Sequence, residues 1–207
     1  MPGAAGGSAP VGPSDPPKYA RPVPEAESQW RCLLTDIEGA VQGHRSRLVS
    51  FLCSESFFII AWYRLNRAGY LRFGRGWRAL RYALSPVMPF VRLFVTSEID
   101  YRASIGPGLR ILHPQLGIVI GATSVIGSHL ILAGGNVIGD ANPRLGDRVQ
   151  MGVGSTVLGP VDVGFAAIVG AGAVVLHDVA DHQTVGGIPA RPIATSPPPS
   201  SRPTEDR

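Results

Sequence analysis

Residues 145–176, LGDRVQMGVGSTVLGPVDVGFAAIVGAGAVVL, repeat one pattern every six residues. An aliphatic side chain returns at every sixth position, namely at Leu145, Met151, Val157, Val163, Val169 and Val175. A helix would space its apolar residues three and four apart, and an isolated strand would alternate at every second residue. A six-residue period sustained over this length is instead typical of a solenoid, in which each unit is one short strand and a turn.

The same period continues towards the N-terminus in two further phases. One phase covers Ile120, Ile126, Leu132 and Ile138, and the other covers Ile105 and Ile111. Three such units make one coil of a triangular prism, and stacked coils bury one continuous apolar column. Glycine follows many of the inward positions, and its lack of a Cβ permits a tight turn there. The sequence therefore predicts a mainly β fold, built as a parallel β-helix.

The repeat is interrupted in two places. Ile111 and Ile120 are nine residues apart, and Ile138 and Leu145 are seven apart. Extra residues must bulge outward, and loops that leave a regular scaffold often carry function. His113 lies in the first interruption, two residues after an inward position, so we expect its imidazole to face outward.

Composition and termini indicate a protein of the cytoplasm. Cys32 and Cys53 fit no metal or redox motif, which favours buried thiols in a reducing compartment. The N-terminal residues lack the basic region and apolar core of a signal peptide. The longest apolar run, residues 48–63, is interrupted by serines and a glutamate and is shorter than the roughly 20 residues of a spanning helix.

Four segments are expected along the chain. Residues 1–27 and 194–207 are rich in Pro, Gly, Ala and Ser and are predicted to be disordered. Residues 28–96 are predicted to be α-helical, because apolar residues from Trp30 to Val41 recur at steps of three and four. Residues 97–193 hold the repeats and form the predicted β-helix domain.

The helical segment has an unusual charge pattern. Between Ser56 and Ser97 there is no acidic residue, while the arginines are Arg64, Arg67, Arg72, Arg75, Arg78, Arg81 and Arg92. Tryptophan, tyrosine and phenylalanine are interleaved with them. A solvated helix face that packs in an oligomer would explain the pattern. The alternative is a surface for an anionic partner, either the inner face of a membrane or a phosphate-bearing substrate. Nothing else in the sequence supports nucleic acid as a partner.

The outward histidine has two candidate acidic partners. Glu98 precedes His113 by 15 residues, and positions 15 to 18 apart can stack on neighbouring coils. Asp100, which is 13 residues away, is a rival for the same role. A carboxylate beside an imidazole fixes its tautomer and raises its basicity, which prepares the ring to remove a hydroxyl proton near neutral pH.

Three sequence features together resemble the hexapeptide-repeat acyltransferases. They are the repeats themselves, His113-Pro114 followed by Gly117-Ile118-Val119-Ile120-Gly121, and the closing Gly186-Gly187-Ile188-Pro189-Ala190-Arg191. The resemblance covers about residues 50–193 and is closest to the serine acetyltransferase branch, which includes relatives that acetylate sugars of surface polysaccharides. It implies a left-handed parallel β-helix, a homotrimer that could pair into a dimer of trimers, and acetyl-CoA bound in the groove between subunits.

The resemblance also assigns roles to individual residues. His113 matches the catalytic histidine, and Glu98 falls on the position of its acidic partner, where serine acetyltransferases usually have Asp. Candidate contacts to acetyl-CoA are Gly135, Asn136, Val153, Ala171 and Arg191. The backbone N–H groups of Gly134 and Gly135 are expected to hold the oxyanion of the reaction.

Two departures from the family pattern concern the acceptor. Serine acetyltransferases have an Asp before the catalytic histidine, and here that residue is Leu112. Their Arg-His pair before a proline is replaced by residues 140–143, which place Asn142 in the expected acceptor loop. A site without counter-charges binds a zwitterion poorly. The sequence therefore predicts a sugar or polysaccharide precursor as the acceptor, with serine as the alternative.

Two other classes of protein compete with this interpretation. Carbonic anhydrases of the γ type use a similar β-helix and bind zinc through histidines, and His177 and His182 have a plausible ligand spacing. They lie where the chain leaves the repeats, far along the sequence from His113 and His129, so we predict no metal. A non-catalytic scaffold is the second rival, and the outward His113 with an acidic partner argues against it.

Overall fold

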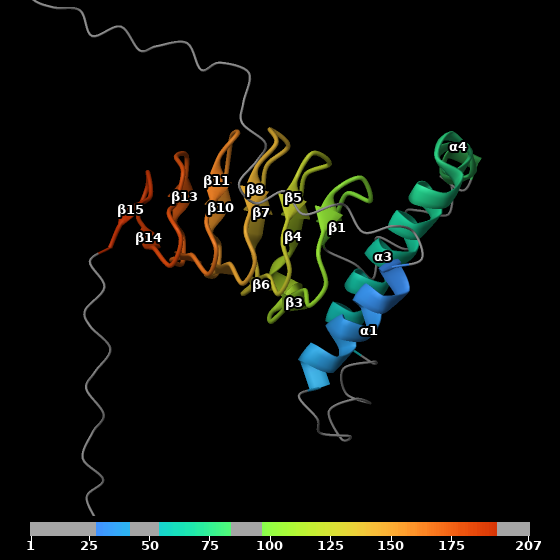
Figure 1. Cartoon of the computed structure of the whole chain (residues 1–207), viewed down its shortest axis with the longest axis horizontal. Helices are drawn as coiled ribbons and strands as arrows, with labels where there is room; N and C mark the ends of the chain where they lie inside the picture. Colours follow the sequence, from blue (N-terminus) through green and yellow to red (C-terminus); the bar gives the residue numbers. More distant parts are fainter. Residues whose placement is uncertain (1–27, 42–53, 84–96, 194–207) are drawn as a thin grey trace, which may run out of the picture.

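The computed structural model describes residues 28–41, 54–83 and 97–193 of the chain. Within these ranges the helices are α1 (Ser28–Val41), α3 (Glu55–Phe73) and α4 (Arg75–Ala83). They lie at one end of a stack of short strands, and α4 is the helix farthest from the strands (Figure 1). The predictions for residues 1–27 and 194–207, and those for Cys53 and Arg92, fall outside the described residues. Cys32 is a buried free thiol, as expected.

The strands of residues 97–193 form the three faces of a prism. The first face contains β1 (Glu98–Ile99), β4 (Ile118–Ile120), β7 (Asn136–Ile138), β10 (Thr156–Val157) and β13 (Val174–Val175). The second face contains β2 (Ser104–Ile105), β5 (Val125–Ile126), β8 (Arg144–Leu145) and β11 (Asp162–Val163). The third face contains β3 (Arg110–Ile111), β6 (Ile131–Leu132), β9 (Gln150–Met151), β12 (Ile168–Val169), β14 (Thr184–Gly186) and β15 (Arg191–Pro192).

The register of the strands confirms the predicted parallel β-helix. Along the second face Ile105, Ile126, Leu145 and Val163 stack in turn, and all four are buried. Full burial of one such side chain contributes about 1.5–3 kcal/mol. Each pairing between successive coils is parallel, and the exception is the antiparallel pair β14–β15 at the last coil. The six-residue period therefore placed the core correctly.

Helix α3 covers the open end of the prism. The Tyr63 hydroxyl donates to the Ala103 carbonyl at 2.9 Å and accepts from the Ile105 N–H at 3.2 Å. The Ser56 hydroxyl donates to the Ile111 carbonyl at 3.1 Å. Among the described residues no coil precedes the first one, and its backbone groups would be unsatisfied if they were buried without partners. Side chains of α3 take the place of that missing coil.

A buried ion pair fixes both long helices to the first coil. Arg64 of α3 donates to the Asp36 carboxylate of α1 at 3.0 Å, and both side chains have no exposed surface. The same guanidinium donates to the Ile105 and Gly106 carbonyls at 2.7 Å each. Asp36 in turn accepts from the Gly108 N–H at 2.7 Å. Asp36 and Arg64 thus neutralise each other's charge inside the fold and hold the helices on the first coil.

This arrangement corrects the interpretation of the arginine-rich segment as one continuous surface. Arg64 and Arg67 are only 1% and 5% exposed. Arg67 donates to the Arg102 carbonyl at 2.7 Å, so it also belongs to the contact between α3 and the first coil. The prediction failed for these two because linear sequence does not show which side of a helix meets another element. None of the described helices has the length and hydropathy needed to cross a membrane.

Candidate active site

His113 lies on a loop that leaves the prism between the third and first faces. The chain turns out after Ile111 and forms the short 3-10 helix η2 (Pro114–Leu116), of which His113 is the N-terminal flanking residue. The Leu116 N–H donates to the His113 carbonyl at 3.3 Å. Pro114 and Ile118 are buried and anchor the two ends of the loop, whereas His113 is exposed. The imidazole is therefore accessible from outside the prism.

The turns that join the third face to the first stack beneath His113, and we call this line of turns the His113 edge. The edge comprises residues 112–117, 133–135, 152–155 and 170–173, and it ends at the β14–β15 turn (residues 187–190), which lies beside Val174 and returns to the third face. Backbone hydrogen bonds link successive turns, from the Gly135 N–H to Gly117 at 2.7 Å and from the Gly172 N–H to Val153 at 2.8 Å. The predicted cofactor residues Gly135, Val153 and Ala171 all fall on this edge.

The His113 edge lacks side chains at its corners. All of its residues with positive φ are glycines, namely Gly117, Gly134, Gly135, Gly154, Gly172 and Gly187, with φ between 65° and 123°. At the edge between the second and third faces, the left-handed positions include His129, Arg148, Ala166 and His182. The left-handed turn therefore does not by itself require glycine in this prism. A Cβ at Gly154 or Gly172 would meet no atom of the chain within 4 Å. The glycines leave a bare strip of surface open to a ligand.

Gly134 allows the next turn to approach the histidine closely. A Cβ at Gly134 would lie 2.5 Å from the His113 carbonyl oxygen and 3.1 Å from the His113 Cβ. The Gly134 N–H donates to the Asn136 Oδ1 at 2.8 Å, and the Gly135 N–H donates to the Gly117 carbonyl at 2.7 Å. Both amide hydrogens are therefore already used. The expectation that these two N–H groups hold an oxyanion is wrong for this conformation.

Asn136 also departs from its predicted role. Its side chain has no exposed surface, because β7 alternates and Asn136 points inward with Ile138. The amide nitrogen donates to the Gly152 carbonyl at 2.7 Å and to the Ser155 hydroxyl at 2.9 Å. A side chain enclosed in this way cannot touch a ligand, so the prediction of a direct cofactor contact is wrong. The signal was present in the sequence, since Asn136 lies two residues before the inward Ile138.

The two candidate acids stand at opposite ends of β1. Glu98 opens the strand, is exposed, and is in register with Val119 on the outer surface of the first face. Asp100 follows the strand, and its carboxylate accepts from the Arg102 guanidinium at 3.0 and 3.1 Å. Partial burial acts to raise the pKa of Asp100, but the hydrogen bonds and charge of Arg102 outweigh it and lower that pKa. Asp100 is thus held by Arg102, whereas Glu98 lies beside β4, the strand that follows the His113 loop, which makes Glu98 the better candidate by position.

The remaining predicted residues occupy other parts of the prism. Asn142 lies in a turn between the first and second faces, where its N–H donates to the Thr123 hydroxyl at 2.9 Å. This is a different edge from that of His113, so one chain does not bring the two together. Arg191 is exposed on β15, opposite Gly186 and next to the last turn of the His113 edge.

No cluster of three or more His, Cys, Asp or Glu side chains that could hold a metal ion occurs among the described residues. His182 instead packs edge-to-face against Phe165, with ring centroids 5.2 Å apart. His177 and His113 belong to different coils. The histidines of the prism are thus separated, and they offer no converging ligand set within the ranges described.

Comparisons with known proteins agree on one family. No family model matches the chain. The serine acetyltransferase of Escherichia coli (strain K12) is 36% identical over 149 residues, which are 68% of this chain and 52% of that protein. The chain thus spans about half the length of the curated relatives it matches.

Solved structures give the same result. Neisseria gonorrhoeae serine acetyltransferase in complex with serine has a TM-score of 0.67 at 30% identity, over 82% of this chain and 72% of that one. A serine acetyltransferase in complex with CoA has a TM-score of 0.67 at 29% identity, over 81% and 70% of the two chains. These neighbours are left-handed β-helices, which confirms the predicted hand. The chain therefore belongs to the serine acetyltransferase family of hexapeptide-repeat acyltransferases.

Proposed function

We propose that this protein is an acetyl-CoA-dependent O-acetyltransferase whose active site lies on the His113 edge. The observation that carries this proposal is the line of glycine corners in the turns next to an exposed histidine. A solenoid that served only as a scaffold would have no need of glycine at every left-handed corner of one edge, because another edge accepts histidine, arginine and alanine there.

The strip suits a long ligand that runs along the prism. Val153 and Ala171 are exposed on successive turns, and the space outside Gly154 and Gly172 is open. We assign the pantetheine arm of acetyl-CoA to this strip, with Gly135, Val153 and Ala171 as its contacts. Arg191, at the C-terminal end of the strip, supplies a positive charge for the phosphates of CoA.

His113 acts as the general base in the proposed reaction. Its imidazole removes the proton of the acceptor hydroxyl while the hydroxyl oxygen attacks the thioester carbonyl. The new C–O bond forms, the C–S bond breaks, and the imidazolium returns the proton to the CoA thiolate. Glu98 stabilises the imidazolium, the role of the acid in a Ser-His-Asp triad. General-base catalysis of this kind contributes about 10² to 10⁴ in rate.

The relatives favour L-serine as the acceptor. Those compared are named serine acetyltransferases, and one neighbouring structure is a complex with serine. This supports the alternative raised from the sequence better than the sugar acceptor that the sequence favoured. We therefore propose serine as the first candidate acceptor.

A sugar hydroxyl remains the second candidate because of Leu112. This side chain is 48% exposed next to His113, where a carboxylate is expected in the family. Asp140, in the replaced acceptor loop, accepts from the Thr123 N–H at 2.8 Å and so stabilises the turn of the preceding coil. A neutral acceptor has no ammonium group to be left without a counter-charge at Leu112.

We also propose a homotrimer as the functional assembly. His113 and Asn142 lie on different edges of one prism, so a site that contains both needs a second copy of the chain. A groove between subunits would bring the His113 edge of one copy to the Asn142 turn of the next. Sedimentation velocity would test this, and a monomer that retains full activity would contradict it.

An assay of thiol release from acetyl-CoA tests the proposed reaction. The purified chain is supplied with L-serine or with a panel of sugars, and the acetylated product is identified by mass spectrometry. We expect O-acetylserine, and loss of turnover by about 10² to 10⁴ in His113→Ala. His129→Ala is the matched control, because this exposed histidine lies on the edge between the second and third faces, outside the proposed groove. Acetylation of sugars but not of serine would make a sugar hydroxyl the acceptor. Unchanged turnover in His113→Ala would refute His113 as the general base.

A further inference from the structure

The outer side of α3 carries an apolar stripe that faces away from the prism. Phe58, Trp62, Leu65 and Phe73 follow one another at steps of four, three and eight residues, and their exposed fractions are 57, 38, 45 and 60%. Trp30 of the neighbouring helix α1 is 56% exposed. Large apolar side chains gathered on one surface usually mark an interaction site. We call these five residues together with α4 the helical face.

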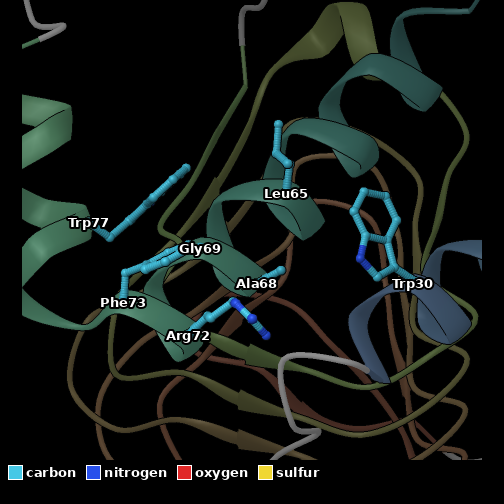
Figure 2. A pocket seen from close by; sticks show the side chains of 7 residues that line it. All are labelled: Trp30, Leu65, Ala68, Gly69, Arg72, Phe73 and Trp77. Atoms are coloured by element: carbon cyan, nitrogen blue, oxygen red, sulfur yellow. The ribbon is translucent and has the colours of Figure 1, made fainter.

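A groove runs across this face (Figure 2). It has a volume of about 290 Å³ and is lined by Trp30, Leu65, Ala68, Gly69, Arg72, Phe73 and Trp77. The rings of Phe73 and Trp77 stack with centroids 6.3 Å apart. A Cβ at Gly69 would lie 2.5 Å from the Trp77 ring, so this glycine is what allows α4 to fold back on α3. The groove is therefore a product of the local packing and is mainly apolar.

Helix α4 is amphipathic but contributes no buried residue. Leu80 is 47% exposed and Tyr82 is 80% exposed, while Arg75 and Arg78 are exposed on the same short helix. Figure 1 places α4 at the far tip of α3, away from the strands. A helix that presents apolar, aromatic and arginine side chains to solvent is typical of segments that lie in a membrane interface.

The charge of the helical face has a single sign. Arg64 and Arg67 are buried and do not contribute, but Arg72, Arg75 and Arg78 are exposed. The sequence between Ser56 and Ser97 contains no Asp or Glu. An isologous contact with a second copy would set this positively charged patch against an identical patch, and like charges across an interface are strongly unfavourable. The occupant of this face should therefore be anionic and apolar at once.

We propose that the helical face docks the protein onto a bilayer that contains anionic lipid. The aromatic rings would sit at the level of the headgroups, where Trp and Tyr are favoured. The exposed arginines would lie against lipid phosphates. This is peripheral docking by α3, α4 and Trp30. The proposal does not depend on the proposed reaction, because binding to vesicles requires no substrate.

Flotation with extruded vesicles tests this docking. The full-length chain is mixed with vesicles of phosphatidylcholine alone, or of phosphatidylcholine with phosphatidylglycerol, at low and at high salt. We expect binding to the phosphatidylglycerol vesicles only, weakened at high salt. Arg72→Gln/Arg75→Gln/Arg78→Gln should weaken it by about a hundredfold, since one cation near an anionic surface contributes a factor of about five. Arg110→Gln/Arg144→Gln/Arg148→Gln removes the same charge from the prism and should bind like the unaltered chain.

Two further results decide the role of the apolar stripe. Phe58→Ser/Phe73→Ser should also weaken vesicle binding, with circular dichroism confirming that the variant is folded. Equal binding to both kinds of vesicle, or an equal loss in the two arginine variants, would overturn the proposal. A phenylalanine variant that binds vesicles normally but sediments as a smaller particle would overturn it as well, because the face would then contact a second copy.

Discussion

Asn136 holds Gly134 beside His113 without itself contacting the histidine. Its Oδ1 accepts from the Gly134 N–H at 2.8 Å, and Gly134 lies so close to His113 that a Cβ there would clash with the His113 carbonyl. The buried asparagine is thus a positioning residue for the His113 loop. It acts through the backbone of the turn between β6 and β7.

Replacing Asn136 by Ala should therefore harm both stability and turnover. The change leaves the Gly134 N–H without its partner, and an unsatisfied buried group costs about 1–3 kcal/mol. We expect a lower melting temperature together with a lower kcat at little-changed KM for acetyl-CoA. Ser155→Ala is the control, because it removes only the 2.9 Å bond from the Asn136 amide nitrogen and keeps the bond to Gly134. If both variants lost kcat equally, the role of Asn136 would be structural only.

Filling the bare strip should weaken acetyl-CoA binding selectively. Gly154→Asn adds a side chain in open space, and asparagine is a residue type that tolerates the φ of 67° at this position. We expect the KM for acetyl-CoA to rise by at least about tenfold, the equivalent of 1.4 kcal/mol. Ala166→Asn adds a side chain at another left-handed position, φ of 52°, on the edge between the second and third faces, which the proposed groove does not include. An equal rise in both variants would argue against the strip as the site.

The sequence predicted the prism well because its core follows a simple rule. Residues such as Met151 and Val163 occur every sixth position, and each of them is buried. Gly135, Val153 and Ala171 were predicted from the family resemblance and not from the period, and the structure places them on one edge because every coil turns at the same phase. Local periodicity was enough wherever each unit contacts only its neighbours in the stack.

The contacts between the helices and the first coil could not be predicted in this way. Asp36 and Arg64 are 28 residues apart, and Arg64 meets Ile105 a further 41 residues along the chain. No period links these positions, so arginines that anchor α3 were interpreted together with exposed ones such as Arg75. The repeat pattern does indicate that the Asn136 side chain points inward, because Asn136 lies two residues before the inward Ile138. The predicted ligand contact followed instead from the family resemblance, as for the neighbouring Gly135.

Breaking the buried ion pair should strongly destabilise the protein. In Asp36→Ala the Arg64 guanidinium stays buried without its carboxylate, and such a loss costs about 3–5 kcal/mol. Urea unfolding followed by circular dichroism measures the change. Asp100→Ala breaks the half-exposed pair with Arg102, and we expect it to cost below about 1 kcal/mol. Similar losses in the two variants would contradict the anchoring role of Asp36.

The Asp100–Arg102 pair also predicts a specific response to acid. The pKa of Asp100 is lower in the folded chain than its usual value of 3.8. Its contribution to stability is therefore present above pH 3.8 and is lost as the pH falls through the folded pKa. The difference in unfolding free energy between the unaltered chain and Asp100→Asn should be constant near neutral pH and should shrink below that value. A difference that grew on acidification would show that the pKa is raised instead.

The choice of acceptor can be tested at Leu112, because its exposed side chain lies next to the proposed base. If serine binds with its ammonium group at this position, Leu112→Asp supplies the missing counter-charge. A hydrogen bond to a charged group contributes about 1.5–3 kcal/mol, so kcat/KM for L-serine should rise by at least about tenfold. Leu116→Asp adds the same charge to a 56% exposed residue of the same loop and should not change it. Turnover of sugars should not improve in either variant, since a neutral hydroxyl acceptor has no charge for the carboxylate to meet. A Leu112→Asp protein with unchanged activity towards serine would mean that the ammonium group is held elsewhere or that serine is not the acceptor.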